Sequence, residues 1–162
     1  MEILKIDAAS AEKLAPLAAD FRVALGSYKG IVSEPNCEAG KAEILEYLRL
    51  RYPVFAAEDA GEPVGYIVCR VEDSLLWVEQ LYVRPDRRRE GIASRLFDKA
   101  EEIARSLGEE TVFNYVHPNN EGVIRFLRSK GYTVLNLIEV RKPYRGEKLR
   151  TTITVGQQVF DY

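Results

Sequence analysis

Apolar residues follow two different spacings along the chain, and the spacing predicts which segments are strands and which are helices. Apolar residues at every second position, or runs of branched residues, predict strands. Such patterns cover residues 2–7, 53–59, 63–72, 74–83, 111–116, 132–142 and 151–160. Apolar residues three or four positions apart predict amphipathic helices, at residues 10–21, 41–51, 91–108 and 120–131. The expected order of elements is therefore β-α-α-β-β-β-α-β-α-β-β.

The connections between these segments restrict how they assemble. A very tight connection joins 63–72 to 74–83, so these two strands are expected to form an antiparallel hairpin. A helix joins strand 74–83 to strand 111–116, which predicts a crossover between parallel neighbours. No internal repeat, low-complexity tract or linker interrupts the chain, so residues 1–162 are expected to form a single domain.

Composition narrows the class of protein. The chain has 162 residues, 46% of them hydrophobic, with a net charge of −2 and a pI of about 5.6, which does not suit a general nucleic-acid binder. The two cysteines, Cys37 and Cys69, have no metal-ligand spacing and imply no disulfide framework, so we expect no metal and a reducing cytoplasm. We expect no signal peptide and no membrane span, because no sufficiently long apolar run is present.

A cluster of arginines, residues 87–89, lies between the strand 74–83 and the helix that follows it. A helix N-terminus presents unpaired N–H groups and the positive end of the helix dipole. Gly91 removes a side chain where a ligand must approach the backbone, and Ala93 keeps the next position small. Together these features favour a site for a pyrophosphate.

The spacing of this cluster resembles one known phosphate-binding pattern. No Walker loop and no G-x-G-x-x-G fingerprint is present, but Arg88-x-x-Gly91-x-Ala93 matches Arg/Gln-x-x-Gly-x-Gly/Ala. The longer segment "VEQLYVRPDRRREGIA" and the segment "NEGVIRFLRSKGY", with Asn120 eleven residues before Gly131, also resemble those of the GNAT (GCN5-related N-acetyltransferase) superfamily. The resemblance covers roughly residues 53 to 140.

This resemblance implies the GNAT fold, an α/β (α+β) architecture with a mixed central sheet of about seven strands flanked by about four helices. It also implies an acetyl-CoA-dependent N-acetyltransferase, in which a primary amine of a small molecule or a protein attacks the thioester directly in a ternary complex. The alternative is a non-catalytic GNAT-like module that binds acyl-CoA. A third reading, nucleic-acid binding through the arginines and the basic stretch 141–150, is disfavoured by the net negative charge.

The resemblance also assigns roles to individual residues. Backbone groups of the strand would pair with the pantetheine arm, and Asn120 would contact the same arm or serve simply as a helix N-cap. The pantetheine-binding strand positions are Leu81, Tyr82 and Val83. The pyrophosphate-binding positions are Arg88, Arg89, Glu90, Gly91, Ile92, Ala93 and Ser94.

Glu79 is the expected general base, because it matches the glutamate of polyamine-type family members. Strict alternation would place it on one face of the strand together with Leu75, Trp77, Leu81 and Val83. The alternative is that a bulge turns Glu79 outward into solvent. His117, the single histidine, is the second candidate for the base.

The sequence departs from the family at Leu127, where many members carry the tyrosine that protonates the leaving thiolate. Tyr82, Tyr115, Tyr144 or solvent would then have to supply that proton, and nothing in the sequence selects one.

Two further expectations concern partners. The acceptor amine is expected between the loop 26–40 and the segment around 140–150, where Glu34 and Glu38 would suit a cation. If the terminal segment 151–162 does not join its own sheet, it could exchange with a second copy and produce a homodimer.

Overall fold

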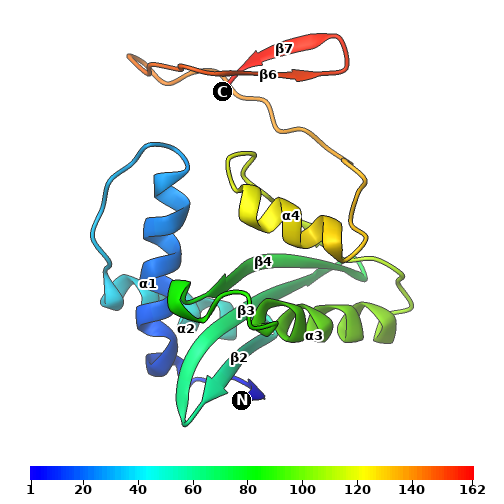
Figure 1. Cartoon of the computed structure of the whole chain (residues 1–162). Helices are drawn as coiled ribbons and strands as arrows, with labels where there is room; N and C mark the ends of the chain where they lie inside the picture. The colour runs from blue at the N-terminus through cyan, green and yellow to red at the C-terminus, as the bar shows by residue number, and fades with distance from the viewer. The chain divides into compact units, whose positions relative to one another are not determined.

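The computed structural model describes all 162 residues (Figure 1). The helices are α1 (Ala11–Ser27), α2 (Cys37–Arg49), α3 (Ile92–Ser106) and α4 (Glu121–Ser129), with a short 3-10 helix η1 (Pro85–Arg87). The strands are β1 (Glu2–Lys5), β2 (Val54–Asp59), β3 (Glu62–Glu72), β4 (Leu75–Val83), β5 (Phe113–Asn114), β6 (Thr152–Val155) and β7 (Gln158–Asp161). The chain divides into two compact units, residues 1–126 and 127–162.

The seven strands and four helices confirm the predicted α/β architecture. Five strands form one mixed sheet in the order β1-β2-β3-β4-β5, in which β5 alone is parallel to its neighbour. The remaining two strands, β6 and β7, pair with each other as an antiparallel hairpin. The tight turn expected between β3 and β4 is present, since Asp73 and Ser74 both have positive φ, the geometry that suits a twisted hairpin.

Four elements differ from the sequence prediction. The segment 151–160, predicted as a single strand, contains the two strands β6 and β7 of a hairpin. The strand expected at 132–142 is absent, and the strand expected at 111–116 is reduced to the two residues of β5. A strand exists only where a neighbour accepts its hydrogen bonds, and periodicity alone does not supply that neighbour. The loop expected at 26–40 is also shorter, because α2 begins earlier. There the Asn36 side chain caps the helix by accepting a hydrogen bond of 3.0 Å from the backbone N–H of Ala39.

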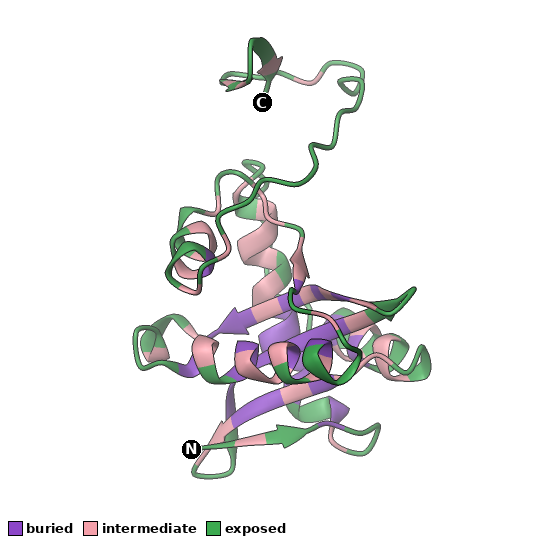
Figure 2. Cartoon of the chain, turned by 90° about the vertical axis from the view of Figure 1, so that its right-hand side faces the viewer, coloured by how far each residue is buried: buried purple, intermediate pink, exposed green.

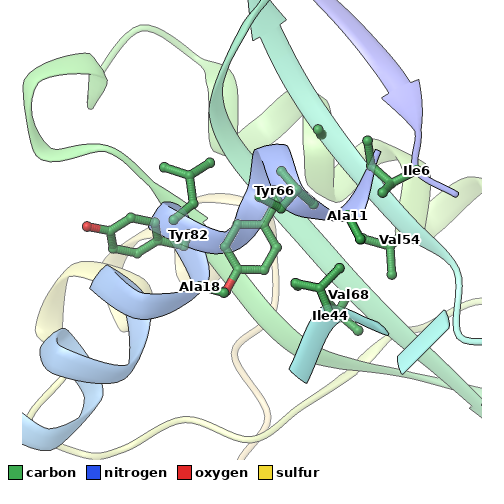
Figure 3. Close-up of a cluster of buried hydrophobic side chains, with 11 residues drawn as sticks. Ile6, Ala11, Ala18, Ile44, Val54, Tyr66, Val68 and Tyr82 are labelled. Atoms are coloured by element: carbon green, nitrogen blue, oxygen red, sulfur yellow. The ribbon is translucent and has the colours of Figure 1, made fainter. Parts of the chain in front are cut away.

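Helices α1 and α2 cover one face of the five-stranded sheet, and α3 covers the other. The core under α1 and α2 contains Tyr66, Val68 and Tyr82 from the sheet with Ile44 from α2, and Figure 3 shows these side chains grouped together. On the opposite face, a Cβ built on Gly65 would lie 3.3 Å from Ile92 of α3. Apolar burial on both faces explains why β3 reads as an almost continuous hydrophobic run.

Burial is concentrated in the central strands, as Figure 2 shows, whereas residues 132–162 are mainly exposed or intermediate. Cys69 is fully buried, as expected of a small hydrophobe, and burial raises the pKa of its thiol to about 12. No helix in the structure is both long enough and apolar enough to cross a bilayer.

Helices α1 and α2 approach each other closely at Gly40. A Cβ at this position would lie 2.5 Å from the carbonyl oxygen of Ala15 and 3.0 Å from the backbone nitrogen of Ala19. A Cβ on Gly122, in α4, would have a single neighbour within 4 Å, the Asn120 side-chain oxygen at 3.8 Å, which is an ordinary van der Waals distance.

We therefore expect Gly40→Ala to lower the free energy of unfolding by about 1–3 kcal/mol, since backbone atoms must move to admit the new methyl group. Gly122→Ala, the matched control, should leave the free energy unchanged or raise it by up to ~1 kcal/mol through helix propensity. Urea denaturation followed by circular dichroism measures both. Equal effects of the two substitutions would show that the α1–α2 contact does not depend on this glycine.

Candidate functional site

The sheet opens between β4 and β5. These parallel strands pair only at Trp77 with Phe113 and at Val78 with Asn114. Beyond this point the edge of β4, residues 79–83, has no neighbouring strand. The predicted pantetheine-binding positions Leu81, Tyr82 and Val83 all lie on this open edge, where backbone N–H and C=O groups can pair with an extended ligand.

A bulge in β4 decides where Glu79 points. Val68 of β3 pairs with Gln80 of β4, and the next β3 residue, Cys69, pairs with Val78. Glu79 is therefore the extra residue in β4. The alternation therefore changes phase at Glu79. Trp77 precedes the bulge and contacts Arg70, while Gln80 follows it and contacts Tyr66 on the same α1/α2-facing side of the sheet.

The strict alternation predicted for this strand is therefore only half right. Glu79 hydrogen-bonds Arg70 and so shares a face with Trp77, but Val83 belongs to the other face, against Gly65 and α3. The bulge does not turn Glu79 fully outward either, because its side chain is only 24% exposed. An inserted residue shifts every later side chain of a strand to the opposite face.

The carboxylate of Glu79 is held by an ion pair. Arg70 Nε donates to Glu79 Oε1 at 2.6 Å, and the same guanidinium also pairs with Glu72 and lies over the Trp77 ring, 5.4 Å from its centroid. These two carboxylates raise the pKa of Arg70, with Glu79 the largest contributor. Arg70 contacts Oε1 alone, which leaves the second oxygen of Glu79 able to accept a hydrogen bond.

The segment between β4 and α3 exposes a series of backbone N–H groups. Arg89 and Gly91 both have positive φ, 70° and 78°, and α3 begins directly afterwards. The backbone N–H groups of residues 89–94 donate no hydrogen bond to a backbone carbonyl outside α3. Such consecutive free N–H groups at a helix start form an anion site. All the predicted pyrophosphate-binding amides are therefore together in one turn.

The arginines around this turn are not equivalent. Arg84 pairs with Asp86, and Arg87 pairs with both Asp59 and Glu90, which stiffens the loop but neutralises these two cations. Arg88 donates from Nε to the carbonyl of Val83 at 3.0 Å and lies over the Tyr82 ring.

Arg89 has no ion-pair partner and is exposed. It is therefore the arginine of the run whose charge is most available to a phosphate.

The β5–α4 loop contacts the end of α1. The His117 ring stacks on Tyr28, with centroids 5.9 Å apart, and Asn119 donates from its side chain to the Tyr28 carbonyl at 2.9 Å. Burial, assisted by the charge of Lys29, lowers the pKa of His117. Asn120 caps α4 by accepting from the N–H of Val123 at 3.2 Å, so its N-cap role is confirmed.

The position of the family's usual tyrosine, Leu127, is buried and apolar. Of the three alternative proton donors, Tyr82 is nearly buried and lies edge-on to Phe21, and burial raises the pKa of its phenol. Tyr115 and Tyr144 are exposed.

A buried polar network near Glu79 was not found from the sequence. Gln80 is only 2% exposed; it accepts from the Tyr66 hydroxyl at 2.6 Å and donates to Glu43 Oε1 at 2.8 Å and to Tyr47 at 3.1 Å. Glu43 in turn pairs with Arg22 of α1. The sequence offers one signal for this network: Gln80, directly after Glu79, stands at a position where alternation predicts an apolar residue.

The acidic residues predicted to receive the acceptor, Glu34 and Glu38, are both exposed, and Glu34 lines a shallow hollow with Arg22 and Glu43. No three His, Cys, Asp or Glu side chains gather closely enough to hold a metal ion.

Comparison with known families gives the site its context. A model of the acetyltransferase (GNAT) family matches residues 24–132, which include the open edge of β4 and the turn before α3. The chain belongs to the GNAT family. Its members are N-acetyltransferases, so the chain is an N-acetyltransferase by family with acetyl-CoA as the acetyl donor, in agreement with the sequence resemblance.

Individual relatives agree with this assignment. An uncharacterized N-acetyltransferase of Methanocaldococcus jannaschii is 32% identical over 85 residues, which cover 48% of this chain and only 38% of that protein. One from Archaeoglobus fulgidus is 28% identical over 140 residues, covering 78% of this chain and 88% of the relative. The solved aminoglycoside acetyltransferase AAC(6')-Iy, in complex with a bisubstrate analogue, has a TM-score of 0.68 at 17% identity, covering 88% of this chain and 98% of its own.

We expect Gly91→Glu to reduce CoA affinity by at least ~100-fold, because a carboxylate would then occupy the space of a phosphate. Any side chain at Gly91 is also strained by its φ of 78°. Gly108→Glu is the matched control, since Gly108 has a φ of 86° just after the other end of the same helix and similar open space around it. Calorimetric titration with CoA measures both. An equal loss for the two variants would indicate general destabilisation and refute the phosphate site.

Proposed function

We propose that this protein transfers the acetyl group of acetyl-CoA to a primary amine by direct attack within a ternary complex. The observation that carries the proposal is the coincidence of three features near the end of β4: an open strand edge, a turn of free amides, and the carboxylate of Glu79 at the bulge. The strand edge suits the pantetheine arm of CoA, the turn suits its pyrophosphate, and the carboxylate suits the incoming amine.

The proposed cofactor contacts follow the chain. The pyrophosphate would lie against the amides of residues 89–94, supported by the charge of Arg89, and the pantetheine arm would extend along Leu81 to Val83. Arg88 is already bound to the carbonyl of Val83, so it fixes the end of the strand as well as adding charge. Asn120, at the start of α4, would contact the same arm.

The proposed reaction at the thioester is a substitution at carbon. The lone pair of the amine nitrogen attacks the carbonyl carbon, the C–S bond breaks, and the thiolate leaves with the electron pair. A backbone N–H of the open strand edge would stabilise the oxyanion. Glu79 would receive the proton that the amine loses, directly or through one water, at the oxygen that Arg70 does not occupy.

The protonation of the leaving thiolate separates two hypotheses. Leu127 cannot donate a proton, so solvent or a tyrosine must do so, and a thiol of pKa about 8.5 leaves adequately without a strong acid. The competing hypothesis is a module that binds acyl-CoA without turnover, and it is motivated by the same leucine. The ion-paired carboxylate of Glu79 favours the enzyme, because a binding module has no need of a base beside the cofactor.

We also propose that the acceptor is a cationic amine, carried by a small molecule or by a protein. The aminoglycoside acetyltransferase AAC(6')-Iy shares only 17% sequence identity with this chain, so its likeness concerns the fold alone and does not narrow the acceptor.

The homodimer expected from the C-terminal segment is likewise a proposal. Its supporting observation is that β6 and β7 pair only with each other while apolar side chains around residues 134–140 stay exposed. The oligomeric state can be measured by light scattering after size-exclusion chromatography.

The proposed base can be tested with Glu79→Gln. We expect kcat to fall by about 100-fold or more, the contribution of a general base, while the affinity for CoA stays the same. Glu62→Gln, on the exposed start of the neighbouring strand β3, should change neither quantity. Release of CoA thiol during amine acetylation gives the rate.

An unchanged rate in Glu79→Gln would remove this residue from the mechanism. Tight CoA binding without thiol release for any amine, in the wild-type protein, would instead favour the binding module.

A further inference from the structure

The ring of Trp77 in β4 stacks with two rings from the neighbouring segment, Phe113 in β5 and Tyr115 just after it. The Trp77 ring lies 4.8 Å from Phe113 with an interplanar angle of 30°, and 4.8 Å from Tyr115 with an angle of 17°. We call these three residues the aromatic platform. Trp77 and Phe113 are partially buried, whereas Tyr115 is 66% exposed and therefore offers a ring to solvent.

The platform lies beside a set of charges with a net negative sign. Glu72, Arg70 and Glu79 form one chain of ion pairs, in which two carboxylates flank one guanidinium and leave a formal charge of −1. Arg70 lies over the Trp77 ring, so the charges and the rings are in direct contact. One negative charge next to an aromatic surface is complementary to a single cation attached to a flat apolar group.

The order of residues along β4 places the platform on the acceptor side of the proposed reaction. The open edge from Leu81 to Val83 is the proposed place of the pantetheine arm, and Glu79 is the proposed base. Trp77, two residues before Glu79, lies farther along β4 from the proposed cofactor and on the same side of the sheet as Glu79. An amine that reaches Glu79 from the side opposite the thioester would have its carbon skeleton against the exposed ring of Tyr115, beside Trp77.

We propose that the aromatic platform binds the acceptor, and that the acceptor is a monocationic primary amine carrying an aromatic ring. This inference rests on the acetyltransferase function proposed above and specifies its substrate class. A polycation would need more than one net negative charge, and an aliphatic amine would gain nothing from an exposed ring stacked on the single tryptophan of the chain. Trp77 and Tyr115 are thus specificity residues.

The first experiment compares two primary amines of equal charge, 2-phenylethylamine and n-hexylamine, by the rate of CoA release. We expect kcat/KM for 2-phenylethylamine to exceed that for n-hexylamine by roughly tenfold, and Tyr115→Leu to remove most of that difference. Leu4→Ala is the control, since Leu4 is exposed on β1, the edge strand farthest from β5. It should preserve the preference.

The second experiment measures binding without turnover. Trp77 is the only tryptophan, so its intrinsic fluorescence reports on the platform directly. With CoA present in place of acetyl-CoA, 2-phenylethylamine should change the emission in a saturable way, with a Kd that rises roughly 3- to 10-fold in Tyr115→Leu. n-Hexylamine should produce a weaker response that does not depend on Tyr115.

The outcomes separate this inference from the function on which it rests. Equal turnover of the two amines, unaffected by Tyr115→Leu, would overturn the platform and leave the acetyltransferase intact. A preference for a polyamine such as spermidine would overturn the monocationic class. If no amine releases thiol although CoA binds, the proposed function fails. Saturable binding of 2-phenylethylamine at Trp77 would then still support the platform as a binding site, and the absence of such binding would overturn it.

Discussion

The hydrogen bonds of Gln80 are the constraint on which the site depends. A buried amide is costly unless its groups are paired, and here Tyr66 of β3 and Tyr47 and Glu43 of α2 provide the partners. Because these partners fix Gln80 on the helix-covered face, the residue before it has to form the bulge. The bulge in turn brings Glu79 to Arg70 and coincides with the end of the β4–β5 pairing. The satisfied amide of Gln80 thus accounts for the position of the carboxylate, which lies next to the open strand edge.

The two ends of the proposed cofactor site would use different physics. At the strand edge, the protein offers backbone groups that a neighbouring strand would otherwise occupy, so the ligand would take the place of a strand. At the start of α3, the protein offers N–H groups that no residue can satisfy from within the helix. Ion pairs hold Arg84 and Arg87 in place, which makes them supports of the loop, and Arg89 supplies the free charge.

Sequence reasoning could predict the turn before α3 because its signals are local: a glycine, adjacent arginines and the start of an amphipathic helix. The bulge at Glu79 could not be predicted, since it depends on a partner strand and on Tyr66, fourteen positions before Gln80. The partner of Glu79 was missed for the same reason, because Arg70 lies on the other strand of the hairpin. The pattern at 132–142 is strand-like, but alternation cannot say whether a neighbouring strand accepts the segment.

The segment after α4 shows what the absence of such a neighbour means. Residues 133–143 donate no backbone hydrogen bond within the chain, and Val134, Leu135 and Leu137 are 87%, 73% and 69% exposed. Amides of this kind exchange with deuterium at close to the rate of an unfolded peptide, whereas those of β3, hydrogen-bonded on both sides within a buried sheet, exchange only when the sheet itself opens. The chain therefore spans a wide range of local stability, and its least protected stretch directly follows α4.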